Sequence, residues 1–213
     1  MFTPFLIAAI LGYFLGAIPI GFLVARARGV NIFEVGSKSP GATNVKRVLG
    51  ARAGNLVFAL DMLKGAVAGG WLLVWRWLDS PVCSCGMENL VAMQIAGVLG
   101  ALLGHSFSCF TKFKGGKGVA TGAGGFLVLM SVPTLIGLAV WAVTYYATRY
   151  VSLASILGAL TVPTVGYLMD YDGILVGISL AVCGFVIVRH RTNIVRLCQG
   201  TEHKFVRKSE KSK

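Results

Sequence analysis

A short stretch of glycines and lysines, FKGGKG (113–118), has the residue types that bind a phosphate group. Glycines let backbone N–H groups approach a ligand closely, and a helix predicted from Val119 would add the partial positive charge of its N-terminus. Lys114 and Lys117 supply two cations. The stretch is not a Walker A loop, because the spacing Gly-x-x-x-x-Gly-Lys-Ser/Thr is absent. The alternative is positive charge that binds anionic lipid headgroups, which is our interpretation of the adjacent Lys112.

A second polar stretch, GSKSPGATNVKR (36–47), combines glycine, hydroxyl, amide and cationic side chains and ends at Arg47. We interpret it as a structured turn, although a plain connector can have a similar composition. Two cationic segments rich in glycine and hydroxyl groups are unusual in one small hydrophobic chain. We therefore expect both to converge on one anionic substrate.

Other polar candidates are scattered along hydrophobic runs. Asp61 and Lys64 are three residues apart, on one face of a helix; charges at membrane depth are usually paired or functional, and both readings stay open. His105 precedes the lysine loop, and a lone histidine is more often structural than catalytic. His190 and Asn193 lie one helical turn apart and are interpreted as a polar clamp. No His, Cys or carboxylate set has the spacing of metal ligands, so no metal is predicted.

Long hydrophobic helices must position these residues. Hydrophobic residues make up 55% of the 213 and charged residues only 13%, where a soluble domain has about a quarter charged. The mean hydropathy is +0.75. This composition predicts an all-α, polytopic membrane protein and excludes an ordinary soluble domain. The first run lacks a preceding basic segment and is interpreted as a retained helix, not a signal peptide. Seven transmembrane helices are predicted at roughly 3–25, 55–77, 89–109, 118–132, 134–148, 153–169 and 173–190.

The hydrophobic segment between Lys117 and Arg149 decides the number of helices. Both cations are expected on the same side of the membrane, which requires two crossings in about 30 residues. A turn at Pro133 would divide the segment into two short helices. The alternative is one long tilted helix and six crossings in total. The basic residues after Arg189 favour seven crossings. With six crossings, this positively charged tail would lie outside the cell.

The distribution of Lys and Arg also predicts the orientation. Basic residues collect in cytoplasmic loops, so the N-terminus is expected outside and the C-terminus in the cytoplasm. We predict one integral-membrane domain over residues 1–205 and a basic cytoplasmic tail over 206–213. Cys83 and Cys85 are interpreted as small apolar residues and not as disulfide or zinc ligands.

Several motifs resemble one known family over nearly the whole chain. They are GATNVKR (41–47), DMLKG (61–65), GH (104–105), FKGGKGVAT (113–121), VSLASI (151–156), RHRTNIVRL (189–197) and GTEHKF (200–205). In this order and spacing they are similar to the bacterial acyl-phosphate:glycerol-3-phosphate acyltransferases, the PlsY family. The resemblance implies a seven-helix enzyme of the bacterial inner membrane whose active site faces the cytoplasm.

The resemblance also implies a reaction and its residues. The family transfers a fatty acyl group from acyl phosphate to the 1-hydroxyl of glycerol 3-phosphate, which gives lysophosphatidate and phosphate, the first committed step of phospholipid synthesis. It implies no cofactor. Expected partners are the lipid bilayer and the enzyme that produces acyl phosphate, with no nucleic acid. By resemblance, glycerol 3-phosphate is bound by Arg47, Lys117, Ser155, His190 and Asn193. Acyl phosphate is bound by Ser37, Lys114, Gly115, Gly116 and Gly118. Supporting roles fall to Thr43, Asn44, Asp61, Lys64 and Glu202.

Three points qualify the resemblance. The family's first loop usually reads Gly-Ser-Gly-Asn, whereas this chain has Lys38 and Ser39 at the last two positions. No catalytic residue is certain: the His-x-x-x-x-Asp dyad of thioester-dependent acyltransferases is absent, so the base is the substrate's own phosphate or His105. The alternative function is a membrane transporter for phosphate or a phospho-ester, which would be expected to show paired inverted halves; none is visible.

Overall fold

The structure is a computed structural model that describes residues 3–77 and 87–205, with side chains described for 3–73 and 89–205. These residues form helices joined by short loops, and no strand occurs within the described ranges. The predicted all-α class is therefore confirmed. The interpretations of Cys83 and Cys85 and of the tail at 206–213 fall outside the described residues.

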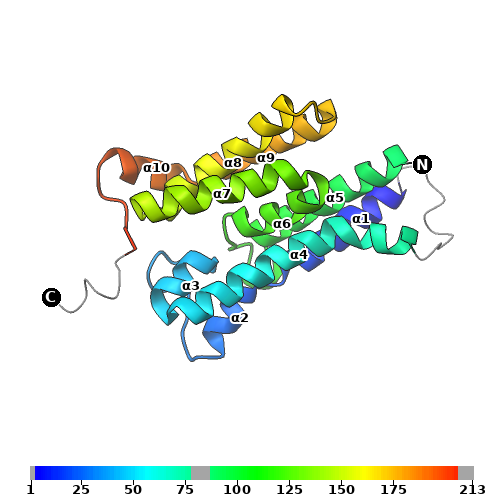
Figure 1. Ribbon diagram of the computed structural model, residues 1–213. Coiled ribbons are helices and arrows are strands. Elements are labelled where there is room, and N and C mark those ends of the chain that lie inside the picture. Colours follow the sequence, from blue (N-terminus) through cyan, green and yellow to red (C-terminus); the bar gives the residue numbers. More distant parts are fainter. Residues whose placement is uncertain (1–2, 78–86, 206–213) are drawn as a thin grey trace. The chain divides into compact units, whose positions relative to one another are not determined.

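The chain divides into two compact units, residues 1–129 and residues 130–213 (Figure 1). The single domain predicted over 1–205 stays a prediction. The helices of the first unit are α1 (Thr3–Ala17), α2 (Ile20–Arg26), α3 (Ala42–Leu49), α4 (Ala51–Trp77), α5 (Met87–Ser106), the short 3₁₀ helix η2 (Cys109–Thr111) and α6 (Val119–Leu129). Those of the second unit are α7 (Ser131–Thr148), α8 (Val151–Leu168), α9 (Gly173–Arg189) and α10 (Arg191–Cys198).

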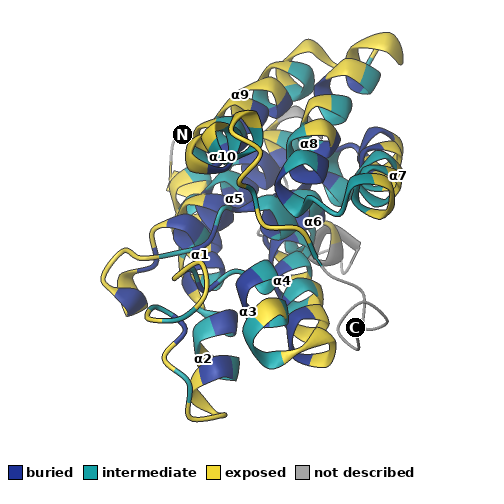
Figure 2. Cartoon of the chain, turned by 90° about the vertical axis from the view of Figure 1, so that its left-hand side faces the viewer, coloured by how far each residue is buried: buried dark blue, intermediate teal, exposed yellow. Residues whose placement is uncertain are grey.

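Close backbone contact holds the first unit together. Helix α1 packs along α5, and α4 packs along α6. A Cβ atom added at Gly12 or Gly16 would collide with the backbone of α5, and one added at Gly65 would collide with the backbone of α6. Buried residues gather where α1 and α5 meet (Figure 2). The small-xxx-small pairs in the sequence thus mark helix–helix contacts.

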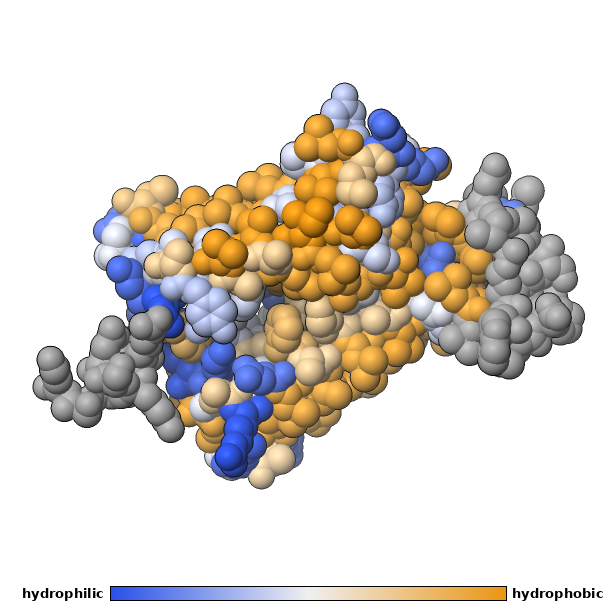
Figure 3. Space-filling view, in the orientation of Figure 1, coloured by the Kyte–Doolittle hydropathy of each residue, from blue (hydrophilic) through white to orange (hydrophobic). Residues whose placement is uncertain are grey.

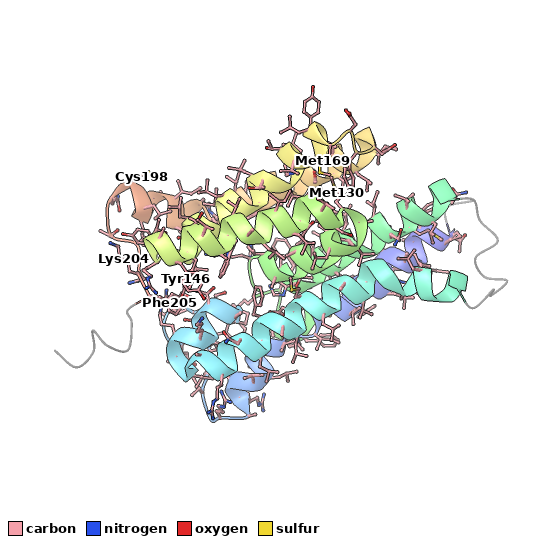
Figure 4. All side chains as sticks on the ribbon, in the orientation of Figure 1. Met130, Tyr146, Met169, Cys198, Lys204 and Phe205 are labelled. Atoms are coloured by element: carbon pink, nitrogen blue, oxygen red, sulfur yellow. The ribbon has the colours of Figure 1, made fainter. Side chains whose placement is uncertain are left out.

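The second unit is built on α8, which packs against α7 and α9 and also contacts α10. The segment after α10 returns to the end of α7, where the Phe205 amide donates to the Arg149 carbonyl at 3.2 Å. The Phe205 ring lies 6.1 Å from that of Tyr145, between centroids. Figure 4 shows Tyr146, Lys204 and Phe205 close together at this end of the unit.

The long helices have the length and composition of membrane spans. Hydrophobic residues cover most of their outer surface in Figure 3. Five helices of the described residues are long and apolar enough to cross a membrane, or six if α9 and α10, which are bent by 61°, count as one span. The count of seven crossings stays a prediction, because the remaining apolar helix, α6, has only 11 residues. At 1.5 Å per residue it extends about 16 Å, short of a hydrocarbon core of about 30 Å.

The structure differs from the predicted helix boundaries in three places. The first run is not one continuous helix, because Pro19 lacks an N–H group and ends α1 at Ala17. The segment after 118 does divide into two helices as predicted, but the break lies at Met130 and Pro133 falls in the first turn of α7. Helices α3 and α10 were not predicted, since both are short and rich in polar residues.

Candidate active site

The glycine loop, residues Lys114–Gly118, lies between η2 and α6 and is fixed to the structure before it. The Gly116 amide donates to the His105 carbonyl at 3.1 Å, and the Lys114 amide donates to the Thr111 carbonyl at the same distance. Gly118 has φ +82°, a conformation that favours glycine. The predicted helix start at Val119 is confirmed. These contacts give the loop a defined backbone shape.

The cations of this loop differ in their surroundings. The Lys114 side chain is exposed, and its ammonium group makes no hydrogen bond or ion pair with any residue that the structure describes. Lys117 is half-buried, and Gly116 and Gly118 are buried. An available ammonium beside backbone N–H groups at the start of a helix is suited to bind phosphate.

The second polar stretch is organised by one side chain, Asn44, which is 1% exposed. Its Nδ2 donates to the carbonyls of Ser39 at 2.9 Å and Val35 at 3.1 Å, and its Oδ1 accepts from the Ser37 amide at 2.8 Å. These bonds hold the segment before α3 as a structured turn, which confirms that interpretation. They also give the supporting role expected for Asn44 a physical basis.

The other residues of this stretch lie around that turn. Ser37 is exposed, and Arg47 lies exposed in the last turn of α3, while Thr43 is half-buried. Lys38 has φ +55°. The family that this sequence resembles usually has glycine at this position. A side chain costs about 1–2 kcal/mol in this left-handed conformation. The substitution at Lys38 is therefore tolerated with strain.

A buried charged cluster lies between α4 and α5. The Lys64 ammonium contacts the Asp61 carboxylate at 2.8 Å, and His105 Nδ1 lies 3.4 Å from the same carboxylate oxygen. The Lys64 ammonium also donates to the Ile18 carbonyl at 3.0 Å, at the break between α1 and α2. The side chains of Asp61, Lys64 and His105 are 3%, 5% and 10% exposed. The paired reading of Asp61 and Lys64 is thus correct, and His105 joins the pair.

These residues line a pocket in the first unit. The pocket is narrow, with a cavity volume of about 10 Å³, and is partly open to the surface. Six of the residues predicted from the sequence line this pocket, three from the charged cluster and three from the glycine loop: Asp61, Lys64, His105, Lys114, Gly115 and Gly116. Ser37, Arg47 and Lys117 are not among its lining residues.

The second unit has its own polar cluster around Glu202. The carboxylate accepts hydrogen bonds from Asn193 Nδ2 at 2.7 Å, from Ser152 Oγ at 2.9 Å and from Arg196 Nε at 2.7 Å. Burial alone would raise the pKa of Glu202, but these three hydrogen bonds outweigh it and hold the pKa below its ordinary value of 4.5. Glu202 is therefore charged at neutral pH and fixes the Asn193 amide.

Two other residues predicted for the site, His190 and Ser155, make hydrogen bonds within this unit. His190 is 3% exposed, and its Nδ1 donates to the Val186 carbonyl at 2.8 Å, so the proton is on Nδ1 in the neutral ring. Ser155, also 3% exposed, accepts from Trp141 Nε1 at 3.3 Å. Ser155, His190 and Asn193 all belong to the ordered interior of the second unit.

Sequence reasoning missed several residues of both clusters. Ser108 and Thr111 line the pocket, and Arg196 pairs with Glu202. A signal existed in one case: Pro19 inside a hydrophobic run indicates a helix break, hence free carbonyl groups that need donors. Ser108 Oγ donates to one of them, the Ala17 carbonyl. No local pattern indicated that Arg196 would pair with Glu202.

Comparison with known proteins gives consistent results. The family profile described as "Glycerol-3-phosphate acyltransferase" matches residues 6–200. A glycerol-3-phosphate acyltransferase of Fusobacterium nucleatum subsp. nucleatum is 45% identical over 199 residues, 92% of this chain and 95% of that protein. One of Geotalea daltonii is 42% identical over 205 residues, 96% of this chain and all of that protein.

A solved structure is also similar. The crystal structure of PlsY (YgiH), described as an integral membrane glycerol 3-phosphate acyltransferase in its glycerol 3-phosphate form, has a TM-score of 0.83 and 35% identity, and the match covers 95% of this chain and 96% of that one. Together with the apolar helices, this indicates a multi-pass membrane protein. With the family profile and two relatives above 40% identity, the chain belongs to the glycerol-3-phosphate acyltransferase family.

Proposed function

We propose that this protein transfers a fatty acyl group from acyl phosphate to the 1-hydroxyl of glycerol 3-phosphate. The hydroxyl oxygen bonds to the acyl carbonyl carbon, the bond from that carbon to the phosphate oxygen breaks, and the proton passes to a phosphate oxygen. Lysophosphatidate and inorganic phosphate are the products. The observation that carries the proposal is the hydrogen-bonded glycine loop at the start of α6, with the Lys114 ammonium available beside it.

The substrates are assigned to two groups of residues. Acyl phosphate is bound by Ser37, Lys114, Gly115, Gly116 and Gly118. Ser37 supplies a hydroxyl donor and Lys114 an ammonium donor, and the glycines let the phosphate approach the backbone closely. Glycerol 3-phosphate is bound by Arg47, Lys117, Ser155, His190 and Asn193. The Lys114 ammonium stabilises the departing phosphate, so no acid is needed to protonate the leaving group. Fixed donors are worth most where charge develops during the reaction, which agrees with the ordered loop.

We propose that no side chain is an obligatory general base. A phosphate monoester has a second pKa near 6 and is able to take the hydroxyl proton itself. His105 is the competing candidate, because its Nδ1 faces Asp61 and a carboxylate in that position can orient a histidine that acts as a base through Nε2. A stable His105→Gln protein that loses about 10⁴-fold in rate would identify His105 as the base.

The proposed topology has seven crossings, with the N-terminus outside and the active site facing the cytoplasm of a bacterial inner membrane. The supporting observation is that Lys117 and Arg149 are separated by two helices, α6 and α7. In a cysteine-free background, a cysteine at position 171 is expected to react with an impermeant reagent added to intact cells, and one at 115 is not. Reaction at 115 from outside would contradict the orientation.

The donor assignment is tested with purified protein in detergent, where transport is impossible. Palmitoyl phosphate, palmitoyl-CoA and palmitoyl carrier protein are supplied separately with glycerol 3-phosphate. We expect lysophosphatidate only with palmitoyl phosphate. Comparable turnover with either thioester would contradict the assignment. Because acyl phosphate requires a separate enzyme to make it, we also expect that enzyme to associate with this protein at the membrane.

A further inference from the structure

A continuous series of polar contacts connects the broken first helix to the glycine loop. It begins at the Ile18 carbonyl, which accepts from the Lys64 ammonium at 3.0 Å. Lys64 pairs with Asp61 at 2.8 Å, and Asp61 faces His105 Nδ1 at 3.4 Å. The His105 carbonyl then accepts from the Gly116 amide at 3.1 Å. Helices α4 and α5, the break between α1 and α2, and the loop are thus joined through two charged side chains and a histidine.

The pocket beside this series does not itself resemble a binding site for a charged ligand. Most polar side chains that line it are already bonded to the protein: Ser108 Oγ donates to the Ala17 carbonyl, and Thr111 Oγ1 donates to the Lys114 carbonyl at 2.7 Å. Lys64 is shared between Asp61 and Ile18. Of the cations in its lining, Lys114 alone has an ammonium without a partner among the described residues. Most polar groups of the pocket therefore hold the loop in place, and Lys114 is the lining cation that is left to bind an anion.

Packing alone does not account for charge at this place. Removing two charges from water is costly, and a buried ion pair can often be replaced by apolar side chains of similar volume without loss of stability. In a membrane the cost favours apolar residues further. The same two helices are joined elsewhere by a neutral contact, from Gln94 Nε2 to the Gly69 carbonyl at 2.9 Å. A neutral contact is thus sufficient to join α4 and α5, and the charges at Asp61 and Lys64 call for another explanation.

The contact between His105 and the glycine loop explains why charged residues are present here. The His105 ring lies so close to Gly116 that a Cβ there would strike its Nε2, and a Cβ at Gly115 would strike the His105 carbonyl. The position of the loop is thus set by the position of His105. The contact with the Asp61 carboxylate is directional and, because the carboxylate is buried, its charge is little screened, so it orients the imidazole more firmly than packing would.

We propose that Asp61 and Lys64 are positioning residues that act through His105 to hold the glycine loop in the geometry that binds the phosphate of the acyl donor. This inference rests on the proposed function. None of the three side chains is assigned a contact with substrate. A displacement of about 1 Å in the groups that hold a reacting molecule can reduce the rate about 100-fold. If the cluster is loosened, the glycine loop is displaced, and because this loop binds the acyl donor, we expect donor binding to be affected first.

The test compares Asp61→Asn, Lys64→Met and the double variant with a matched control, Gln94→Leu. The control removes a buried polar contact between the same helices but lies outside the pocket. For each protein we measure kcat, the KM for palmitoyl phosphate, the KM for glycerol 3-phosphate, the inhibition constant of inorganic phosphate against palmitoyl phosphate, and the midpoint of thermal unfolding in detergent.

For Asp61→Asn we expect the KM for palmitoyl phosphate and the inhibition constant of phosphate to rise together by about 10-fold, because the displaced loop holds the phosphate less firmly, an effect about as large as weakening one charge-assisted hydrogen bond. The KM for glycerol 3-phosphate is expected to change by less than about 3-fold, since uniform binding is lost at one subsite only. Gln94→Leu is expected to lower the unfolding midpoint without changing either KM.

Two results would overturn the inference. One is an unchanged KM for palmitoyl phosphate in a folded Asp61→Asn or double variant. The other is an equal rise in both KM values in all variants including Gln94→Leu, which would indicate general loosening of the fold. Should Lys64→Met fail to fold because Asp61 is left unpaired, the double variant, which carries no net buried charge, decides. Absence of turnover by the unsubstituted protein with palmitoyl phosphate would instead contradict the proposed function.

Discussion

Two carboxylates organise the polar interior of this protein, and they do so in different surroundings. Asp61 lies in the middle of an apolar helix, where its partners Lys64 and His105 are almost fully buried. Glu202 lies in the irregular segment after α10, and its side chain is 6% exposed while that of its partner Arg196 is 37% exposed. Each carboxylate gathers donors from more than one element, but of these partners only Arg196, beside Glu202, is more than one-third exposed.

The difference indicates how each cluster responds to change. Around Asp61 water cannot replace a lost partner, so the loss of one charge leaves the other uncompensated. Around Glu202 three donors share the carboxylate and solvent screens the Arg196 charge, so no single donor is decisive. The Asp61 cluster is therefore expected to be the more sensitive to substitution, and the Glu202 cluster the more sensitive to pH.

The largest effect is expected from Lys64→Met. It leaves the Asp61 carboxylate buried without its cation, which should lower the free energy of unfolding by about 3–5 kcal/mol. The double variant with Asp61→Asn removes both charges and should recover much of this loss. Unfolding of the detergent-purified proteins by denaturant measures both. Equal losses in the single and double variants would show that charge compensation is not what stabilises this cluster.

A somewhat smaller effect is expected at the cations outside both clusters. Arg47→Ala and Lys117→Ala should each lower kcat/KM by about 10- to 150-fold, since a charge-assisted hydrogen bond to phosphate is worth about 1.5–3 kcal/mol. The control is Lys112→Ala, an exposed lysine of the same region, which should change kcat/KM less than about 2-fold. Equal losses at Lys112 and Lys117 would mean that only the total positive charge matters.

The pH dependence of stability should distinguish the Glu202 cluster. The pKa of Glu202 in the folded state lies below its ordinary value of 4.5, so its contribution is fully present above pH 4.5 and is lost as the pH falls through the lowered value. We expect a contribution of about 1–3 kcal/mol from the buried donors. Glu202→Gln should lower stability at pH 7 and make the decline below pH 4.5 shallower. If the loss of stability below pH 4.5 were unchanged in Glu202→Gln, other carboxylates would be responsible for it.

The smallest effect is expected at a loop that neither carboxylate reaches. Lys38 has φ +55° in the turn held by Asn44, and glycine adopts this conformation without strain. Lys38→Gly should therefore raise the free energy of unfolding by about 0.5–1 kcal/mol, after the entropy cost of glycine in the unfolded chain. Thermal unfolding measures this, with Lys112→Ala as the control for lost charge. A destabilised Lys38→Gly protein would show that the ammonium contributes a contact that outweighs the strain.

The sequence by itself determined the helical class, the apolar helices and the glycine loop that ends at the start of α6. These follow from composition, from the length of hydrophobic runs and from the conformational freedom of glycine, all of which are local. The order of the motifs was also sufficient for the resemblance that the comparisons then confirmed. The short helices α3 and α10 could not be predicted from the sequence, because they depend on packing and not on a strong hydrophobic pattern.

Only the tertiary structure decided which partner each polar side chain has. Asp61 and Lys64 are a visible pair in the sequence, but their contacts with His105 and the Ile18 carbonyl exist because α1, α4 and α5 pack together around the break at Pro19. Glu202 likewise accepts a hydrogen bond from Ser152, 50 residues away in the sequence. A hydrogen bond requires its two atoms within about 3 Å, and whether distant segments come that close is settled by packing of the whole unit rather than by any local pattern.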